Sequence, residues 1–407
     1  MYRKKFFFIL ITIIYISIIS TSSFAIENSL YVWSSNVVTE EKTAPTSSKP
    51  TELDLKCESA ILIEQNTGTV LYEKNPHEKL RPASVTKVMS ILLIMEAIDS
   101  GKIKYEDKVP CSENAASMGG SQIWLDTREE LTVDEMLKAI CVNSANDCVV
   151  AMAEYIEGST EQFVTKMNEK AKKLGMKDTV FKNCHGLDED GHETSSYDIS
   201  LMSRELLMKH PDVTKYTTIW SDTLRNGKSS LTNTNKLIRN YKGATGLKTG
   251  STSLALYNLS ASATRDNLSL IAVVMKAPTT KDRFADAEKL LDYGFGQYSY
   301  VQLAKKGEKI NEIEIKKGTK GNIQAIYEED ALLLSKKGSE KNIEHVVNLP
   351  QNVQAPIEKG QILGEIVYKQ DGKEIKKVNL IADESVKKLT LLNIAEKVFL
   401  SWFRLLR

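Results

Sequence analysis

The chain has 407 residues, of which 42% are hydrophobic and 26% are charged, a globular composition with enough length for two domains. Its 54 basic and 53 acidic residues leave a formal net charge of +1. Because this balance gives no positive field that would gather a polyanion, we do not expect nucleic acid among the partners.

The N-terminus has the three parts of a secretory signal peptide. Basic residues at 3–5 precede the apolar run 6–19, and small residues at 23 and 25 follow at the spacing of a cleavage site. The run is shorter than the roughly 20 residues of a membrane-spanning helix. This favours a signal peptide over residues 1–25, cleaved after Ala25, over an uncleaved anchor, and in both cases the bulk of the chain is exported.

The cysteines and histidines indicate neither a disulfide framework nor a metal site. The chain has an odd number of cysteines and no close CxxC pair, which argues against a fold cross-linked by disulfides even in an exported chain. Cys141 and Cys148 are seven residues apart, so they could share one helix face as buried apolar residues. The five histidines are scattered and no HExxH motif occurs, so we expect no metal.

The first part of the chain predicts a linker, a strand pair and a buried helix. Residues 26–56 form a linker, because most of this segment is polar, rich in Ser, Thr and Pro, and aperiodic. Residues 59–75 alternate on either side of an Asn-Thr-Gly turn, which predicts two strands. After Pro82 the apolar residues surround a helix on all sides, so this helix should lie at the centre of a domain.

Helices are predicted over residues 132–174. The first begins at the capping box Thr132-x-x-Glu135, and another begins near Ser159 and ends at Gly175. From residue 245 onward three successive strands are expected, followed by a helix starting near Arg283. Strands at both ends of a helical middle predict an α+β domain over residues 57–298.

The C-terminal part has a different residue pattern from the rest of the chain. Short β-prone runs alternate with Lys-Gly turns, which predicts a small all-β domain over residues 301–382. Residues 385–407 place apolar side chains near one side of a helix, with charged residues interrupting any run long enough to span. We expect an amphipathic helix lying on the membrane surface. The alternative is a helix docked on the protein's own surface.

Ser84 and Lys87 form an SxxK motif at the start of the buried helix. The i, i+3 spacing places both side chains on one face. Burial would lower the pKa of Lys87 enough for it to remove the serine proton. The alternative is a helix-capping serine followed by an exposed lysine. A second SxxK, Ser385 to Lys388, lies in the tail without a buried helix, so the motif alone proves nothing.

Ser144 and Asn146 form an SxN motif between two apolar helical segments. Polar residues at such a place cost stability unless they are satisfied or functional. A site would give Ser144 a proton-relay role and let the Asn146 amide bind a substrate carbonyl. The alternative is an asparagine-containing kink between core helices, and the SxN pattern itself recurs at residues 34–36 and 112–114.

Residues 243–252, GATGLKTGST, place one lysine among three glycines on a predicted strand. Missing side chains at Gly250 and its neighbours would let a ligand lie along the strand edge. Lys248 and the Thr249 hydroxyl would then hold a carboxylate. The alternative is a loop with a solvated charge.

In this order and these contexts, SxxK, SxN and KTG resemble the penicillin-recognising serine acyltransferases. The chain is similar to the low-molecular-mass penicillin-binding proteins that are D-alanyl-D-alanine carboxypeptidases of serine peptidase family S11. The resemblance is carried by these motifs and by further stretches: RPASVTKVMS, GGSQIW, NSANDCVVAMAEYI, MNEKAKKLGMKDTVFKNCHGLDEDGH, TGLKTGST and RFADAEKLLDYGF. It covers nearly the whole chain after the linker.

The resemblance implies the family's fold, a transpeptidase domain with an antiparallel sheet and helices, and no metal or cofactor. It implies that Ser84 is acylated, that Lys87 is its base and that Ser144 relays a proton to the departing D-alanine. It also implies that Asn146 helps to hold the substrate. The substrate's terminal carboxylate is assigned to Lys248 and Thr249, and the oxyanion hole to the backbone N–H groups of Ser84 and Ser251.

The substrates implied are peptidoglycan peptide stems ending in D-Ala-D-Ala, with β-lactams as acylating inhibitors, at the outer face of the cytoplasmic membrane in cell-wall biogenesis. The chain departs from the family pattern at Ala145, where glycine is usual, and at Asn258, where cysteine is common. His185 is expected to stabilise a loop rather than to act as a base.

Two other functions fit parts of this pattern. A β-lactamase would share the acylation step but needs a carboxylate base for water, and no glutamate here lies in a recognisable deacylation motif. A catalytically inactive scaffold that binds wall peptides is disfavoured by the intact Ser84, Lys87, Ser144 and Lys248.

Overall fold

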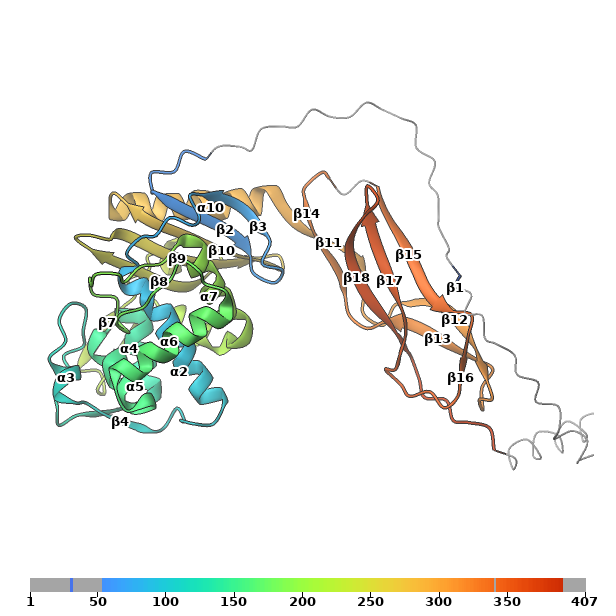
Figure 1. Ribbon diagram of the computed structural model, residues 1–407, viewed down its shortest axis with the longest axis horizontal. Coiled ribbons are helices and arrows are strands. Elements are labelled where there is room, and N and C mark those ends of the chain that lie inside the picture. The colour runs from blue at the N-terminus through green and yellow to red at the C-terminus, as the bar shows by residue number, and fades with distance from the viewer. Residues whose placement is uncertain (1–29, 32–52, 340–341, 391–407) are drawn as a thin grey trace, which may run out of the picture. The chain divides into compact units, whose positions relative to one another are not determined.

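The computed structural model describes residues 30–31, 53–339 and 342–390. The chain divides into two compact units, Thr43–Tyr300 and Val301–Arg407, the second of which also takes in Met1–Lys42. We describe each unit by itself (Figure 1).

The first unit is built on a five-stranded antiparallel sheet in the order β3-β2-β10-β9-β8. Its outer strand β8 carries the KTG motif. The central strand β10 is almost entirely buried because the sheet is covered on both faces, which explains its near-continuous apolar sequence. The bounds are β2 (Ser59–Glu64), β3 (Val70–Lys74), β8 (Ala244–Thr252), β9 (Leu256–Arg265) and β10 (Leu268–Ala277). The strands expected at both ends of this domain are confirmed.

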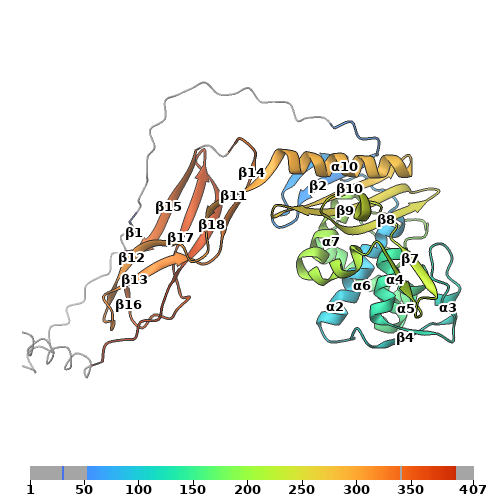
Figure 2. The same cartoon turned by 180° about the vertical axis from the view of Figure 1, so that it is seen from behind.

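Helices cover the two faces of this sheet. Figures 1 and 2 show α10 (Thr280–Gln297) on one face and the helices from α2 to α7 on the other. The helix α2 (Lys87–Asp99) is buried on all sides, as its sequence predicts, and packs in the centre of the core. The others are α3 (Glu113–Ala116), α4 (Val133–Asn143), α5 (Asn146–Glu157), α6 (Thr160–Leu174) and α7 (Ser196–Lys209).

The caps of these helices follow the sequence signals. Thr132 and Glu135 form the capping box of α4. Ser159 caps the start of α6, and this helix ends at Gly175 in a left-handed conformation. The expectation that Cys141 and Cys148 share a helix face is wrong, because Cys141 lies on α4 and Cys148 on α5, two separate helices. Both thiols are nevertheless buried, and all five cysteines, each of which the structure describes, are free.

Short elements complete the first unit around the helices and the sheet. They are η1 (Ala83–Thr86), η2 (Pro211–Val213), α8 (Thr214–Thr217), α9 (Leu237–Asn240), and the pairs β4 (Lys108–Pro110) with β5 (Glu130–Thr132) and β6 (Ser221–Leu224) with β7 (Ser229–Thr232). Of these, η1 carries Ser84 and leads directly into α2.

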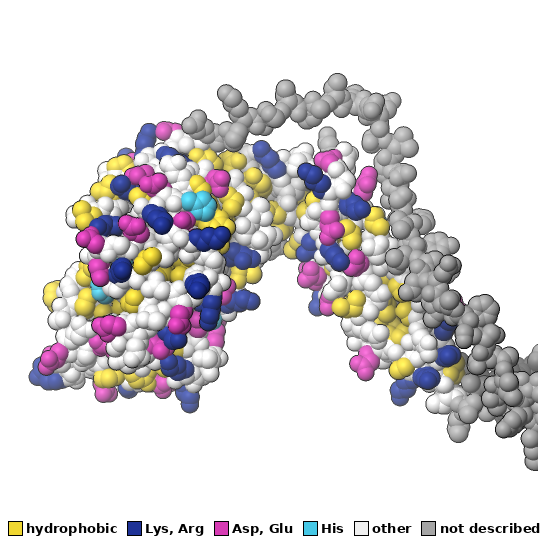
Figure 3. Space-filling model, in the orientation of Figure 1, with side chains coloured by type: hydrophobic (Ala, Val, Ile, Leu, Met, Phe, Trp, Pro, Cys, Tyr) yellow, Lys and Arg dark blue, Asp and Glu magenta, His cyan; other side chains and the backbone are white. Residues whose placement is uncertain are grey.

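The second unit is all-β, as the sequence predicts, with its own apolar core. A seven-stranded sheet has the order β1-β15-β17-β18-β13-β12-β16, and β11 pairs with β14. The bounds are β11 (Tyr298–Ala304), β12 (Lys309–Lys316), β13 (Asn322–Tyr327), β14 (Ala331–Lys336), β15 (Ile343–Pro350), β16 (Asn352–Gln354), β17 (Ile362–Gln370) and β18 (Lys373–Ala382). Figure 3 shows charges of both signs interspersed over one face of each unit.

Two predictions at the chain ends need correction. Leu30–Tyr31, inside the predicted linker, form β1 and pair with Leu349 and Pro350 of β15. The amphipathic helix does not begin at residue 385: Val386 bridges to Ile357, and the neighbouring residues continue without helix to residue 390. The signal segment and residues 391–407 lie outside the described residues. Among the described helices, none is long and apolar enough to cross a membrane.

Candidate active site

Ser84 lies in the 3-10 turn η1, and Lys87 is the first residue of α2. The capping interpretation of Ser84 is wrong, because the N-cap position of α2 is Thr86. Lys87 is not exposed either: its side chain has no solvent-accessible area, while Ser84 is half-buried. A buried lysine beside a partly accessible serine is the arrangement that the sequence predicts for a nucleophile and its base.

The Lys87 amine has three oxygen neighbours. Its Nζ lies 2.9 Å from Ser84 Oγ, 2.6 Å from Asn146 Oδ1 and 2.7 Å from the carbonyl oxygen of His185. The Asn146 amide is oriented by its Nδ2, which donates to the Gly119 carbonyl at 2.6 Å. Both Asn146 Oδ1 and the His185 carbonyl can therefore only accept hydrogen bonds.

These contacts decide how a neutral Lys87 points. Burial, reinforced by the positive charge of Lys248, lowers the pKa of Lys87 well below its usual value. A neutral amine has two hydrogens and one lone pair. Since Asn146 Oδ1 and the His185 carbonyl take the two hydrogens, the lone pair faces the Ser84 hydroxyl, which can donate its proton.

Ser144 and Asn146 lie at the junction of α4 and α5. Ser144 ends α4 in a left-handed conformation with a φ of 64°, and among the residues that the structure describes its buried Oγ has no hydrogen-bond partner. A buried hydroxyl without a partner is costly, and a substrate or water could satisfy it. Ala145 has a φ of −57°, so this position does not require the glycine usual in the family.

The KTG motif lies on the edge strand β8. Lys248 is almost fully buried, its Nζ donates to the Thr249 carbonyl at 3.1 Å, and burial lowers its pKa to about 7. Thr249 Oγ1 donates to Thr234 Oγ1 at 2.7 Å. Ser251 is exposed at the end of the motif. The solvated-loop interpretation of Lys248 is thus wrong.

Two glycines enclose the nucleophile turn. A Cβ added to Gly250 would lie 2.8 Å from the Pro82 carbonyl oxygen and 2.9 Å from the Ser84 nitrogen. On the other side, a Cβ on Gly186, whose φ is +90°, would lie 1.9 Å from the Ala83 carbonyl oxygen. Since these neighbours are backbone atoms, only glycine allows β8 and the loop after His185 to approach Ser84 so closely.

His185 and His192 support this loop. The His185 ring accepts from the Leu187 N–H at 3.2 Å, and burial lowers its pKa to about 3, so the ring is neutral. The His192 Nδ1 accepts from the Lys182 N–H at 3.0 Å, which leaves its Nε2 to donate to Thr86 Oγ1 at 2.8 Å. His185 thus contributes its carbonyl to Lys87 and its ring to the loop.

Asn258 is a residue to which the sequence assigned no role. Its side chain is fully buried; Nδ2 donates to the Arg81 carbonyl at 2.8 Å and Oδ1 accepts from the Lys276 N–H at 2.7 Å. In the ladder it lies opposite Gly250. One amide therefore fastens the segment before Ser84 to β9 and β10.

Replacing Asn258 with Ala should lower the free energy of unfolding by about 2–3 kcal/mol, because a partly buried carbonyl and a partly buried N–H both lose their partner. Urea unfolding of the full chain, read from the transition of the first unit, measures this. The exposed Asn240→Ala is the matched control and should change stability by less than about 0.5 kcal/mol. A loss no larger than the control would contradict the fastening role.

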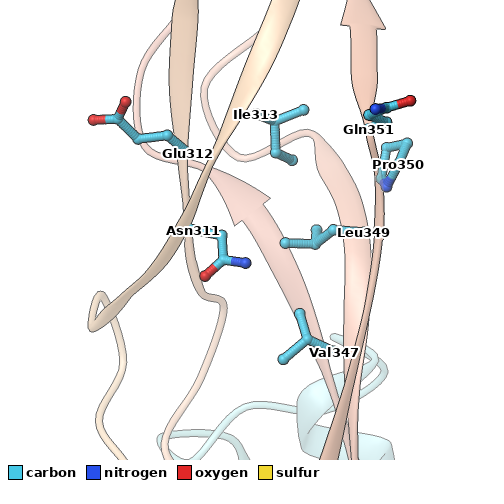
Figure 4. A pocket seen from close by; sticks show the side chains of 7 residues that line it. All are labelled: Asn311, Glu312, Ile313, Val347, Leu349, Pro350 and Gln351. Atoms are coloured by element: carbon cyan, nitrogen blue, oxygen red, sulfur yellow. The ribbon is translucent and has the colours of Figure 1, made fainter. Parts of the chain in front are cut away.

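One cavity outside the candidate site does not offer this chemistry. A cavity of about 380 Å³ lies in the second unit between β12 and β15. Figure 4 shows Ile313, Val347 and Leu349 gathered there while the Glu312 carboxylate points away. Its lining contains no nucleophile. Within the described ranges, no group of three or more His, Cys, Asp or Glu residues could hold a metal ion.

Comparisons with known proteins identify the family of this chain. The family model described as D-alanyl-D-alanine carboxypeptidase (Peptidase S11) matches residues 42–279, and that of the penicillin-binding protein 5 C-terminal domain matches residues 298–388. The D-alanyl-D-alanine carboxypeptidase DacF of Bacillus subtilis is 47% identical over 358 residues, which cover 87% of this chain and 92% of DacF.

Solved structures are similar over most of the chain or over a smaller part of it. Penicillin-binding protein 5 from Haemophilus influenzae has a TM-score of 0.69 and 32% identity, covering 84% of this chain and all of that one. The ampicillin-bound form of penicillin-binding protein D2 from Listeria monocytogenes has a TM-score of 0.55 and 31% identity, covering 60% of this chain and 99% of that one. With its family models, its relatives and its fold in agreement, this chain belongs to the D-alanyl-D-alanine carboxypeptidases of peptidase family S11.

Proposed function

We propose that the carboxypeptidase reaction of this chain proceeds through an acyl-enzyme at Ser84, with Lys87 as the general base. The observation that carries the proposal is the position of Lys87 Nζ, 2.9 Å from Ser84 Oγ and within 2.7 Å of two oxygens that can only accept. In the neutral amine these two oxygens would take both hydrogens and leave the lone pair for the Ser84 proton. Ser84 and Lys87 thus meet the distance requirement of a nucleophile and its base.

In the acylation step, Ser84 Oγ attacks the carbonyl carbon of the penultimate D-alanine as its proton passes to Lys87. The negative charge that develops on the carbonyl oxygen is stabilised by the backbone N–H groups of Ser84 and Ser251, an oxyanion hole supported by the close approach of Gly250 to Ser84. The Asn146 amide, which has one N–H left besides its bond to Gly119, helps to hold the substrate.

The C–N bond then breaks, and the departing amine of D-alanine takes a proton. We assign this transfer to Ser144, whose buried hydroxyl has no hydrogen-bond partner among the described residues: it would donate its own proton to the departing amine and take up the proton that Lys87 removed from Ser84. Water later attacks the Ser84 ester, which frees the shortened peptide and restores the serine. A β-lactam would be opened by the same attack, as the ampicillin-bound form of the related Listeria protein suggests.

The terminal carboxylate of the substrate would lie at Lys248 and Thr249. Support comes from Lys248, which is buried and has no carboxylate partner in the described part of the chain, and from the Thr249 hydroxyl, which a hydrogen bond to Thr234 holds in place. A buried ammonium without a counter-charge is unfavourable, so an incoming carboxylate would stabilise the protonated form of Lys248.

Replacing Lys248 with Met should lower kcat/KM for D-alanine release by about 100-fold, because a charge-assisted contact with the carboxylate is lost. The same variant should be more stable than the wild type at pH 6. The pKa of Lys248 is about 7 in the fold against 10.5 as the reference value. Between these two pH values the unfolded chain binds more protons than the folded chain, so the wild type loses stability as the pH falls from 10.5 to 7, and the loss is complete at pH 6.

The stability gain of Lys248→Met should therefore be full below pH 7 and shrink as the pH rises toward 10.5. Thermal unfolding between pH 6 and pH 9.5 measures it, with the exposed Lys228→Met as the control. A gain that grows with pH would contradict the assigned burial of the ammonium.

The physiological substrates proposed are peptidoglycan peptide stems ending in D-Ala-D-Ala, at the outer face of the cytoplasmic membrane. Export is supported by the signal-like residues 1–25 and surface attachment by the amphipathic pattern up to residue 407. Binding of the full chain to anionic vesicles, compared with a chain ending at residue 390, tests the attachment.

The activity is tested by incubating the full chain with labelled penicillin and with a diacyl D-Ala-D-Ala peptide. Stable labelling together with D-alanine release is the expected result. Rapid loss of label with hydrolysis of the drug would instead favour a β-lactamase. A chain that takes no label and releases no D-alanine would contradict the proposed function.

A further inference from the structure

The loop from Gly119 to Leu125 is held against the active site by the junction of α4 and α5. Asn146 Nδ2 donates to the Gly119 carbonyl at 2.6 Å, and the Asn146 backbone N–H donates to the Ser121 carbonyl at 2.7 Å. Asn143 Nδ2 donates to the Gln122 carbonyl at 3.0 Å. The residue that accepts from Lys87 therefore also fixes the start of this loop.

The end of the loop is fixed as firmly around Trp124. The fully buried Asp147 carboxylate accepts the N–H groups of Ile123 and Leu125, each at 3.1 Å. Arg225 Nη1 donates to the Ile123 carbonyl at 2.9 Å. Arg225 is itself held by the two oxygens of the Glu129 carboxylate, at 2.5 and 2.7 Å.

This support places Trp124 in an unusual state. Its φ is 60°, a left-handed conformation that is unfavourable for a bulky residue. Its neighbours Ile123 and Leu125 are buried, yet the Trp124 side chain is 77% exposed. A single exposed apolar residue is common on protein surfaces, but this one is held on a strained backbone by a buried carboxylate and an ion-paired arginine. Strain maintained in this way is typical of functional sites.

The position of the loop indicates which part of a substrate the indole could meet. The peptide's C-terminal end is assigned to β8, on the Gly250 side of Ser84. Gly120, the second residue of the loop, closely approaches the Asn146 amide, and Trp124 follows four residues later. Four residues of chain span at most roughly 14 Å, so Trp124 lies no farther than this from Gly120. A few substrate residues before D-Ala-D-Ala can cover the same distance.

We propose that Trp124 is a specificity-determining residue that binds the part of the peptide stem preceding D-Ala-D-Ala, an inference that rests on the proposed function. The exposed indole offers a flat apolar surface for the methylene groups of an extended peptide, and its ring face also attracts an ammonium group. The rigid loop keeps this surface in place before the substrate binds, which reduces the ordering cost of binding.

The test compares two substrates of the full chain, N-acetyl-D-Ala-D-Ala and a longer peptide with a lysine immediately before the same two residues. Trp124→Ala should lower kcat/KM for the longer peptide about tenfold while changing that for the acetylated dipeptide less than about twofold. Trp124→Phe should keep most of the activity on the longer peptide, because an aromatic surface remains.

Tyr155→Ala, another exposed aromatic residue outside the loop, is the matched control and should leave both substrates unchanged. The proposal is overturned if a folded Trp124→Ala variant loses kcat/KM equally on both substrates, or loses it on neither. The melting temperature shows that the variant is folded. If the wild type releases D-alanine from neither substrate, the carboxypeptidase activity itself is contradicted, an outcome distinct from a failure of Trp124 alone.

Discussion

The Ser84→Ala variant should lose D-alanine release by about 10⁴-fold or more and should take no penicillin label. The reason is that, among the described residues, Ser84 supplies the hydroxyl at Lys87 Nζ, and removing a nucleophile from a concerted catalytic set typically costs this much. Ser84 is half-buried in a short turn, so the fold should tolerate alanine. The measurements are the release rate, label retention and the melting temperature.

The chain provides its own control for this variant. Ser385 begins a second SxxK, but it lies in the extended tail segment rather than before a buried helix, and its Oγ accepts from the Lys359 N–H. Ser385→Ala should therefore keep full activity and full labelling. Label that persists in Ser84→Ala and disappears in Ser385→Ala would reverse the assignment.

Replacing Lys87 with Met should lower kcat by about 10³-fold, in the middle of the range for losing a general base. KM should change far less, because Lys87 is not assigned to the carboxylate of the substrate. A pH profile distinguishes the base from a structural group. The pKa of Lys87 is lowered by burial and then by the charge of Lys248, so wild-type activity should rise with pH well below the ordinary range of lysine.

This rise should be absent from the residual activity of Lys87→Met. The matched control is Lys388→Met, in the second SxxK, which should keep both the rate and the acid limb of the profile. If the rate of Lys87→Met still falls toward low pH as the wild-type rate does, another group is the base.

The sequence was sufficient to predict the elements that carry the site. The apolar residues on all sides of α2 predicted a buried start for the helix, and Lys87 is indeed without exposure. The polar interruption at Ser144 predicted a break, and the structure has one, with Ser144 in a left-handed conformation. These features depend on neighbours within a few residues, so local patterns contain them.

Features that depend on distant segments could not be predicted in this way. The carbonyl of His185 that accepts from Lys87 comes from 98 residues away. The Asn258 amide reaches Arg81 across 177 positions. Neither contact leaves a periodic or spacing signal, because a backbone carbonyl is present at every residue. The extended start of the predicted tail helix likewise depends on a bridge from Val386 to Ile357.

The location of the acyl group is the most direct test of the account. The full chain is incubated briefly with benzylpenicillin, quenched and digested, and the modified peptide is identified by mass spectrometry. The account predicts one adduct with the whole mass of the drug, because ring opening adds the drug without a leaving group, located at Ser84. An adduct on any other residue, or D-alanine release by a chain that forms no adduct at Ser84, would contradict it.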